Sequence, residues 1–235
     1  MNFQGSFLRL GDMDISPIKG LVEQLTDLHW AGEATRQERY EAHKDTQAIG
    51  LVYDEDFRHT NPTVQPAYNL FGPVLRNLFA MIAEYYETSA DILAKFDRPV
   101  RGYFIRVNLV KLRAGGEITP HWDMNFSLAH SHRIHVPIIT NDQVFFRVGQ
   151  ETAVMKEGEV IEINNRRRHS VINEGTEDRV HLILDWAFPW EPCCCSQKVH
   201  PGVPCSPDAC IEIDRRKIPC HCFPEEGSLD PSIQA

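Results

Sequence analysis

The order of its hydrophobic patterns constrains this chain most, because helix-like periodicity comes first and short strand-like segments come afterwards. Apolar side chains recur at three- and four-residue steps over residues 16–30 and 71–87, which predicts two amphipathic helices, and a shorter helix is expected over 90–96. From residue 103 to 187 the apolar segments become brief and are separated by turns. Helices followed by many short strands favour a mainly β fold, an antiparallel sandwich or barrel that is supported by helices.

The strands predicted in the second half are defined by alternation and by turn residues. Residues 103–110 alternate along a strand, and residues 179–187 form a long apolar strand. A hairpin is expected from residues 153–155 and 160–163, which flank a turn at Glu157-Gly158. Shorter strands are predicted at residues 51–53, 118–123, 133–138 and 143–148, and residues 56–66 form a polar segment rich in turn residues.

Composition divides the chain into three parts. With 235 residues, of which 42% are hydrophobic, the chain is long enough to bury a substantial core. We predict an N-terminal helical region at 1–98 that packs on a catalytic core at 99–190, followed by a cysteine-rich tail or small module at 191–235. All seven cysteines lie between Cys193 and Cys222, so the main body is not a disulfide scaffold.

Charge and the length of apolar runs argue against two classes of partner. The formal net charge of −9 disfavours nucleic acid, because an acidic surface repels phosphate backbones. The longest apolar runs, such as residues 180–184, fall far short of the roughly 20 residues that a membrane span needs. The first residues show no basic segment followed by an apolar one, so we expect no secretory signal and a cytoplasmic location. The oligomeric state is not predicted.

The strongest local motif is His121-Trp122-Asp123, which is followed by His169 on a later predicted strand. Side chains at positions i and i+2 of a strand face the same side, so His121 and Asp123 would point into one cavity. Two imidazoles and one carboxylate on one face of an octahedral ion leave three positions open, which is the facial triad of non-haem Fe(II) oxygenases. The pair His-x-Asp is a weak pattern by itself, and a surface loop or a core histidine is the alternative.

Arg179 follows His169 by ten residues, across a predicted turn at residues 173–175. A returning strand would place its guanidinium deep in the same cavity. There it could bind the distal carboxylate of a keto diacid, since arginine binds carboxylates with two parallel hydrogen bonds. The alternative is an exposed strand end at which Arg179 pairs with Asp178 or Glu177.

Arg133 and His135 form a second polar pair, opposite the apolar side chains of residues 134, 136 and 138. Two basic groups on one face of an apolar strand are costly to bury unless an anion meets them. The carboxylate beside the keto group of a keto acid, or a carboxylate of the substrate, would be such an anion. A solvated outer face is the alternative.

Together these motifs resemble the aspartyl/asparaginyl β-hydroxylase family, which also includes bacterial hydroxylases of free amino acids such as the cis-proline hydroxylases. The resemblance rests on the order and spacing of four pieces over roughly residues 100–190. They are His121-Trp122-Asp123, Arg133-Ile134-His135-Val136-Pro137, Lys156-Glu157-Gly158-Glu159, and His169-Ser170-Val171 with Asp178-Arg179-Val180-His181-Leu182.

The resemblance implies a double-stranded β-helix, a cupin-like jelly roll, that uses Fe(II), 2-oxoglutarate and O2. His121 and His169 match the family's iron-binding histidines, and Asp123 matches the carboxylate ligand of its proline-hydroxylating members. The animal aspartyl hydroxylase lacks this carboxylate, so the chain departs from that enzyme. Asp123 also argues against a halogenase, which needs the same coordination position for chloride.

The resemblance also assigns the basic residues and the reaction. Arg179 matches the arginine that binds the distal carboxylate of 2-oxoglutarate, and Arg133 and His135 match the basic pair that contacts its other carboxylate or the substrate. The implied reaction is hydroxylation of an unactivated C–H of an amino acid, free or within a peptide, with release of succinate and CO2. Further candidates for substrate contacts, which would otherwise only bond the loops around them, are Arg58, His59, Asn61, Arg106 and Asn108.

Two other functions remain open at this point. A cupin-like metal-binding protein or isomerase would share the triad but would have no need of Arg179. An interaction protein would carry its function in the tail. There, Cys205 and Cys210 fit one zinc-binding pair, whereas Cys220-His221-Cys222 and the run at 193–195 supply no clean second pair. A disordered or redox-labile tail is the alternative.

Overall fold

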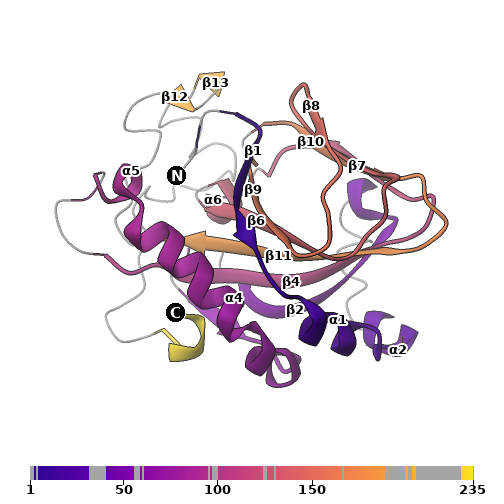
Figure 1. Cartoon of the computed structure of the whole chain (residues 1–235), viewed down its shortest axis with the longest axis horizontal. Helices are drawn as coiled ribbons and strands as arrows, with labels where there is room; N and C mark the ends of the chain where they lie inside the picture. Colours follow the sequence, from indigo (N-terminus) through magenta and orange to yellow (C-terminus); the bar gives the residue numbers. More distant parts are fainter. Residues whose placement is uncertain are drawn as a thin grey trace.

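Two antiparallel sheets face each other in the computed structural model (Figure 1). It describes residues 3, 5–31, 41–55, 59, 61–94, 96, 100–123, 126–129, 131–165, 167–188, 199–200, 203–204 and 229–234. The large sheet has the order β1-β9-β6-β11-β4-β2-β3, and the small sheet has the order β5-β10-β7-β8. From β4 to β11 the chain crosses between the two sheets in jelly-roll order, with β7 and β8 as consecutive strands of the small sheet, which confirms the predicted double-stranded β-helix.

Each strand is short and bounded by turns. The large sheet consists of β1 (Phe7–Asp12), β9 (Glu159–Ile163), β6 (His132–Ile139), β11 (Arg179–Ala187), β4 (Tyr103–Leu112), β2 (Thr46–Asp54) and β3 (Pro62–Val64). The small sheet consists of β5 (Glu117–His121), β10 (His169–Asn173), β7 (Val144–Val148) and β8 (Glu151–Ala153). A separate antiparallel pair, β12 (Val199–His200) and β13 (Val203–Pro204), falls in the cysteine-rich segment.

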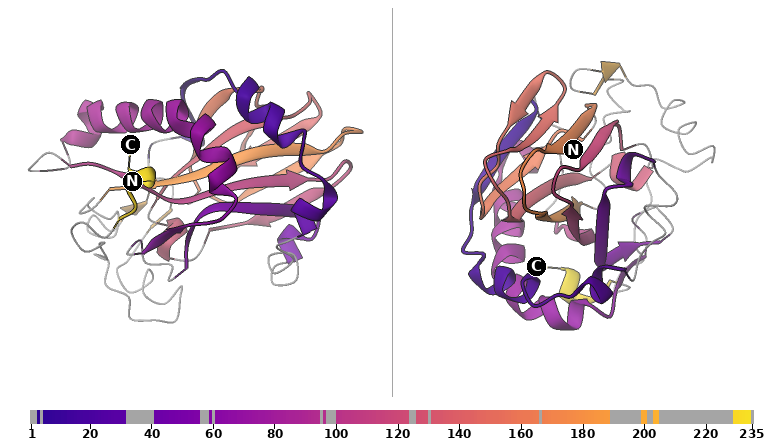
Figure 2. Two further views of the ribbon diagram at one scale, coloured as in Figure 1. Left: turned by 90° about the horizontal axis from the view of Figure 1, so that it is seen from below. Right: turned by 90° about the vertical axis from the view of Figure 1, so that its right-hand side faces the viewer.

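Helices cover the outer face of the large sheet. The helical elements are α1 (Ser16–Val22), α2 (Asp27–Trp30), η2 (Glu41–His43), α4 (Tyr68–Thr88), α5 (Ala90–Leu93), α6 (Phe126–Ala129) and η4 (Pro231–Ile233). Figure 2 shows α4 and α1 on one side of the large sheet. Apolar side chains of these two helices form the main core with alternate residues of β6, β4 and β11, including Val136, Leu109 and Leu182. The amphipathic pattern of α4 therefore determines which face of the large sheet is covered.

The opposite face of the large sheet looks toward the small sheet. A second apolar core fills part of the space between the sheets and joins Leu112 and Ile163 of the large sheet to Val144, Phe146 and Val171 of the small one. The remaining inward positions of β6 and β11 carry charged and imidazole side chains. These include Arg133, His135, Arg179, His181 and Asp185, all of them buried.

Three local predictions differ from the structure. The helix predicted over 16–30 is two helices, because α1 ends at Val22 and Thr26, whose N–H donates to Nδ1 of His29 (3.0 Å), begins a new one. Residues 56–66 include strand β3. The region 1–98 is also more than helical, since β1, β2 and β3 extend the large sheet at both edges. The division at residues 98 and 190 stays a prediction.

The predicted hairpin is wrong. Strand β8 pairs with β7 in the small sheet, whereas β9 pairs with β1 and β6 in the large sheet. The intervening turn carries the chain across, and Gly158 has a φ of +81°, where a Cβ would lie 2.6 Å from the carbonyl oxygen of Met13. Local alternation cannot reveal this, because it reports a strand but not the sheet that the strand joins.

Among the helices in the described part of the chain, none combines the length and the apolar character that crossing a membrane requires.

Candidate metal centre

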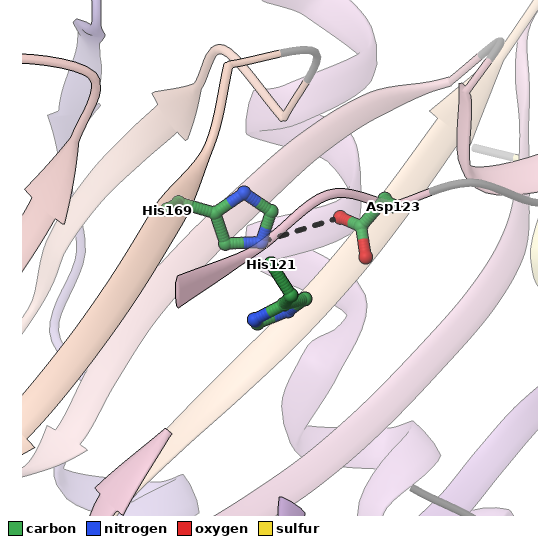
Figure 3. Close-up of side chains that lie close together, drawn as sticks. All are labelled: His121, Asp123 and His169. Carbon is green, nitrogen blue, oxygen red and sulfur yellow. Dashed lines mark ion pairs between the residues drawn. The ribbon is translucent and has the colours of Figure 1, made fainter. Parts of the chain in front are cut away.

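Two histidines lie opposite each other at the ends of neighbouring strands. His121 is the last residue of β5, His169 is the first residue of β10, and the two are partners in the antiparallel register. Their ring centroids are 4.4 Å apart. Asp123 completes the group, since one ligand atom from each of the three residues lies within 4.8 Å of the others (Figure 3). The structure therefore brings the three predicted ligands together.

Asp123 reaches this position by a different route from the one predicted. Strand β5 ends at His121, so the alternation of a strand does not orient residue 123. Trp122 is half exposed, and the carboxylate of Asp123 turns inward to contact Arg133 on β6. Its Oδ2 lies 3.6 Å from Nε2 of His169. The third ligand is thus placed by a side-chain partner on the large sheet.

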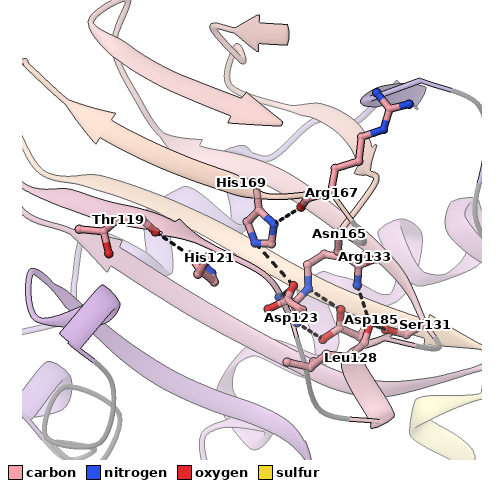
Figure 4. Close-up of polar contacts among 10 residues, drawn as sticks. All are labelled: Thr119, His121, Asp123, Leu128, Ser131, Arg133, Asn165, Arg167, His169 and Asp185. Atoms are coloured by element: carbon pink, nitrogen blue, oxygen red, sulfur yellow. Dashed lines mark hydrogen bonds and ion pairs between the residues drawn. The ribbon is translucent and has the colours of Figure 1, made fainter. Parts of the chain in front are cut away.

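Backbone carbonyls fix the tautomers of both histidines. Nδ1 of His121 contacts the carbonyl oxygen of Thr119 at 2.8 Å, and Nδ1 of His169 contacts that of Arg167 at 3.0 Å (Figure 4). A carbonyl oxygen only accepts, so each Nδ1 carries the proton and each Nε2 keeps its lone pair. This is the arrangement in which imidazole binds a metal ion.

Charges around the triad favour its ligating protonation states. Burial alone would raise the pKa of Asp123, but Arg133 and the nearby imidazoles outweigh it and hold the pKa well below its ordinary value. Burial lowers the pKa of His169 to about 4, against the opposing effect of Asp123. At neutral pH the site therefore offers a carboxylate and a neutral imidazole.

Arg133 is held by two carboxylates. Its Nε and Nη2 donate to Oδ1 and Oδ2 of Asp185, each at 2.8 Å, and its Nη1 donates to Oδ2 of Asp123 (Figure 4). Burial lowers the pKa of Arg133, but the two carboxylates outweigh burial and raise it above its ordinary value. The expectation that an anion meets Arg133 is therefore fulfilled by the protein's own residues, with two of the five guanidinium N–H groups not used in these bonds.

Arg179 lies at the other end of β11 and is completely buried. Within the described part of the chain, none of its Nε, Nη1 and Nη2 atoms has a hydrogen-bond partner. Its register partner Leu112 belongs to the core between the sheets, so Arg179 lies on the inner face rather than at an exposed strand end. Burial lowers the pKa of Arg179 to about 9. A buried guanidinium without a partner is costly unless a ligand supplies an anion.

Two histidines line the inner face beside Arg179. His181 is buried, and neither of its ring nitrogens has a hydrogen-bond partner in the residues that the structure describes. His135 lies 5.8 Å from it between ring centroids and 4.9 Å from the ring of Phe146 on the small sheet. Burial lowers the pKa of both histidines well below the ordinary value, and Arg179 adds to this effect. Arg133 lowers the pKa of His135 further, and His135 does the same for His181. His135 thus faces the small sheet as expected, and both rings are neutral at neutral pH.

The further candidates for substrate contacts lie in different places. Arg106 and Asn108 lie on the inner face of β4, opposite Asp185 and Ile183, and the guanidinium of Arg106 stacks on Tyr53 at 5.1 Å. His59 instead joins its segment to α6, since its Nε2 contacts the carbonyl oxygen of Ser127 at 2.8 Å. Asn61 is exposed. Arg58 and all seven cysteines, with the proposed zinc pair, lie outside the described residues.

Asp185 and His181 were not predicted as site residues. Both occupy alternate positions on β11 in register with Arg179, so they share its inward face. The signal that could have found them is the alternation itself, because Arg179, His181 and Asp185 all fall on the same face of an otherwise apolar strand.

The donor set fits the groups that the family resemblance implies. Two imidazole Nε2 atoms and one carboxylate suit a ferrous ion with open coordination positions. The unpartnered guanidinium of Arg179, with His135 and His181 beside it, suits an anionic co-substrate.

Comparisons with known proteins agree with this site. Residues 83–189 match the family described as aspartyl/asparaginyl beta-hydroxylase, and the matched segment contains the triad and Arg179. The match confirms the resemblance and the hydroxylase class that it implies. Among proteins of curated function, none matches the sequence significantly.

Several solved structures are similar at low sequence identity. An oxidoreductase of the 2OG-Fe(II) oxygenase family from Burkholderia pseudomallei is 16% identical, with a TM-score of 0.48, over 77% of this chain and 93% of that chain. The non-haem monooxygenase ThoJ in complex with nickel is 11% identical, with a TM-score of 0.45, over 79% and 74%. A viral collagen prolyl hydroxylase from Paramecium bursaria Chlorella virus 1 is 9% identical, with a TM-score of 0.43, over 77% and 96%.

Proposed function

We propose, on the premise that residues 83–189 match the aspartyl/asparaginyl β-hydroxylase family, that this enzyme hydroxylates an unactivated C–H of an amino acid, free or within a peptide. His121, Asp123 and His169 are the proposed metal ligands, and Arg179, His135 and Arg133 the proposed contacts of 2-oxoglutarate or substrate. The reaction releases succinate and CO2. The proposal places this reaction in the cytoplasm.

The observation that carries the proposal is the state of Arg179. A completely buried guanidinium without any hydrogen-bond partner points to an anion from outside the chain. A dicarboxylate that binds the metal at one end and Arg179 at the other would supply it. A cupin-like isomerase or metal-binding protein that uses no keto diacid has no use for this group.

In this proposal, different residues hold the metal ion, orient the co-substrate and exclude water. When bound, Fe(II) with 2-oxoglutarate and O2 supplies the oxidising chemistry. The triad would hold the ion through two neutral imidazoles and a carboxylate. Arg179 would anchor the distal carboxylate, and His135 lies within electrostatic reach of both Arg179 and His169. Burial of His169, His135 and Arg179 would help to keep bulk water away from the reacting atoms.

The choice of an amino-acid substrate is supported by the inner face of β4. Arg106 and Asn108 lie there beside the Arg133–Asp185 pair, and they offer a cation and an amide for a substrate carboxylate or amide group. An Asp-, Asn- or Pro-like residue carries groups of this kind in its backbone or side chain. A small molecule or a peptide would both satisfy this chemistry.

Succinate formation tests the proposal. The enzyme with Fe(II), 2-oxoglutarate and O2 is screened against amino acids and peptides, and at least one should stimulate succinate release. The Asp123→Ala variant should lose that stimulated release. The Asp142→Ala variant, which removes the same group from an exposed turn, should keep it. Normal turnover by Asp123→Ala would show that the triad assignment is wrong.

A further inference from the structure

The three ligands of the triad differ in what orients them. His121 and His169 are held by backbone carbonyls two residues earlier in their own strands. Asp123 lies beyond the end of β5 and has no such support from its strand. A ligand outside regular structure needs a side-chain partner to fix its rotamer, and partners of this kind tune the affinity of metal sites. For Asp123 that partner is Arg133.

The direction in which Arg133 points is itself fixed by a second carboxylate. Asp185 is directly opposite Arg133 in the β11–β6 register and is completely buried. Its two oxygens accept from Nε and Nη2 at 2.8 Å each, which aligns the plane of the guanidinium with that of the carboxylate. The remaining edge, with Nη1, then faces Asp123 (Figure 4). Orientation therefore passes from Asp185 to Arg133 and from Arg133 to Asp123.

Charge gives Asp185 a second role. A guanidinium that contacted only Asp123 would neutralise the one anionic ligand of the triad and weaken its attraction for a divalent cation. Because Asp185 compensates the guanidinium, the three buried groups together keep one negative charge. Those groups are side chains with no more than a tenth of their surface exposed, so solvent screens this balance little.

We propose that Asp185 is a positioning residue of the metal centre, which holds the guanidinium of Arg133 so that Asp123 is oriented yet keeps its negative charge for the ion. This inference rests on the proposed function, because it takes the triad to be the metal site. Asp185 does not contact the ion in this scheme. It acts entirely through Arg133.

Binding of Mn(II) to the full-length, metal-free protein tests the inference without any measurement of activity. Free Mn(II) is followed by its electron paramagnetic resonance signal during titration. The Asp185→Asn variant keeps the shape but loses the charge, and its dissociation constant for Mn(II) should rise at least about 10-fold. The Asp178→Asn variant, which removes the same charge just before β11 at an exposed position, should bind as the wild type does. Wild-type affinity in Asp185→Asn would overturn the inference.

A neutral double variant separates this role from a merely structural one. Arg133→Gln combined with Asp185→Asn removes the neutralising guanidinium together with its partner, so it should bind Mn(II) more tightly than Asp185→Asn alone. An affinity no better than that of the single variant would overturn the inference. If Asp185→Asn does not fold, Asp185→Ser, which is smaller and also neutral, replaces it in both comparisons. A wild-type protein that binds no Mn(II), or a His169→Ala variant that binds it unchanged, would contradict the proposed function as well.

Discussion

Buried polar groups are paired at one end of the inner face of β11 and unpaired at the other. At the end near the triad, Asp185 and Arg133 are joined by two hydrogen bonds, and Arg133 adds a third to Asp123. At the other end, Arg179 and His181 are also buried, and their side-chain nitrogens have no hydrogen-bond partner among the described residues. Arg179 and Asp185 are six positions apart on β11. The same sheet therefore holds a completed network and an incomplete one.

This difference between the two ends separates buried charges that stabilise the fold from buried charges that are available to bind a ligand. A paired buried ion stabilises the geometry of its neighbours, and removing one partner leaves the other charge uncompensated. An unpartnered buried ion lowers the stability of the protein and is retained where binding restores the balance. The same substitution at the two ends should therefore affect stability in different directions.

The largest effect on stability is expected at the paired end. Arg133→Met should lower the free energy of unfolding by about 3–5 kcal/mol, because Asp185 and Asp123 would remain buried without their cation. Urea unfolding of the metal-free protein measures this. If Arg133→Met were as stable as the wild type, the ion pairs of Arg133 would not stabilise the fold, and the two ends of β11 would not differ in this respect.

Arg179→Met tests the unpaired end with the same change of side chain. The metal-free variant should be at least as stable as the wild type, since the substitution removes an uncompensated charge and leaves no partner behind. Its affinity for 2-oxoglutarate in the presence of Mn(II) should fall roughly 100-fold. Calorimetric titration without O2 measures the affinity. A marked loss of stability together with an unchanged affinity for 2-oxoglutarate would show that Arg179 serves the fold and not the binding of the co-substrate.

A smaller effect is expected from pH. Burial, then Arg179 and His135, lowers the pKa of His181 well below its ordinary value, so the unfolded chain takes up a proton below about pH 6.5 and the folded protein does not. Stability must then fall as the pH falls through that range. Between pH 8 and 5.5, His181→Leu should lose about 1 kcal/mol less stability than the wild type. Urea unfolding of the metal-free proteins at both pH values measures these losses. An equal loss of stability in the wild type and in His181→Leu would contradict the prediction.

Much of the site was predictable because the strands that carry it have clear local signals. The span of β11 agrees with the prediction residue for residue, and the inward position of Arg179 follows from its alternation with Val180 and Leu182. His121 and His169 were placed by their motifs, and the register confirms that they meet. Signals of this kind are local, so a sequence displays them directly.

The errors concern relations between distant segments. The strand predicted at 160–163 agrees with β9, whereas the one predicted at 153–155 overlaps β8 only at Ala153. The two were joined as a hairpin because nothing in either segment indicates its sheet. The internal partner of Arg133 was also missed, because Asp185 lies 52 residues away and is recognisable only once β6 and β11 pair. Which buried polar groups satisfy one another is a property of the tertiary fold.

The contact between Asp123 and Arg133 has a mechanical consequence as well. Asp123 follows β5 of the small sheet and Arg133 belongs to the large sheet, so this ion pair joins the two sheets beside the proposed metal site. It would therefore limit how far the two sheets can move apart at this point before any ligand binds.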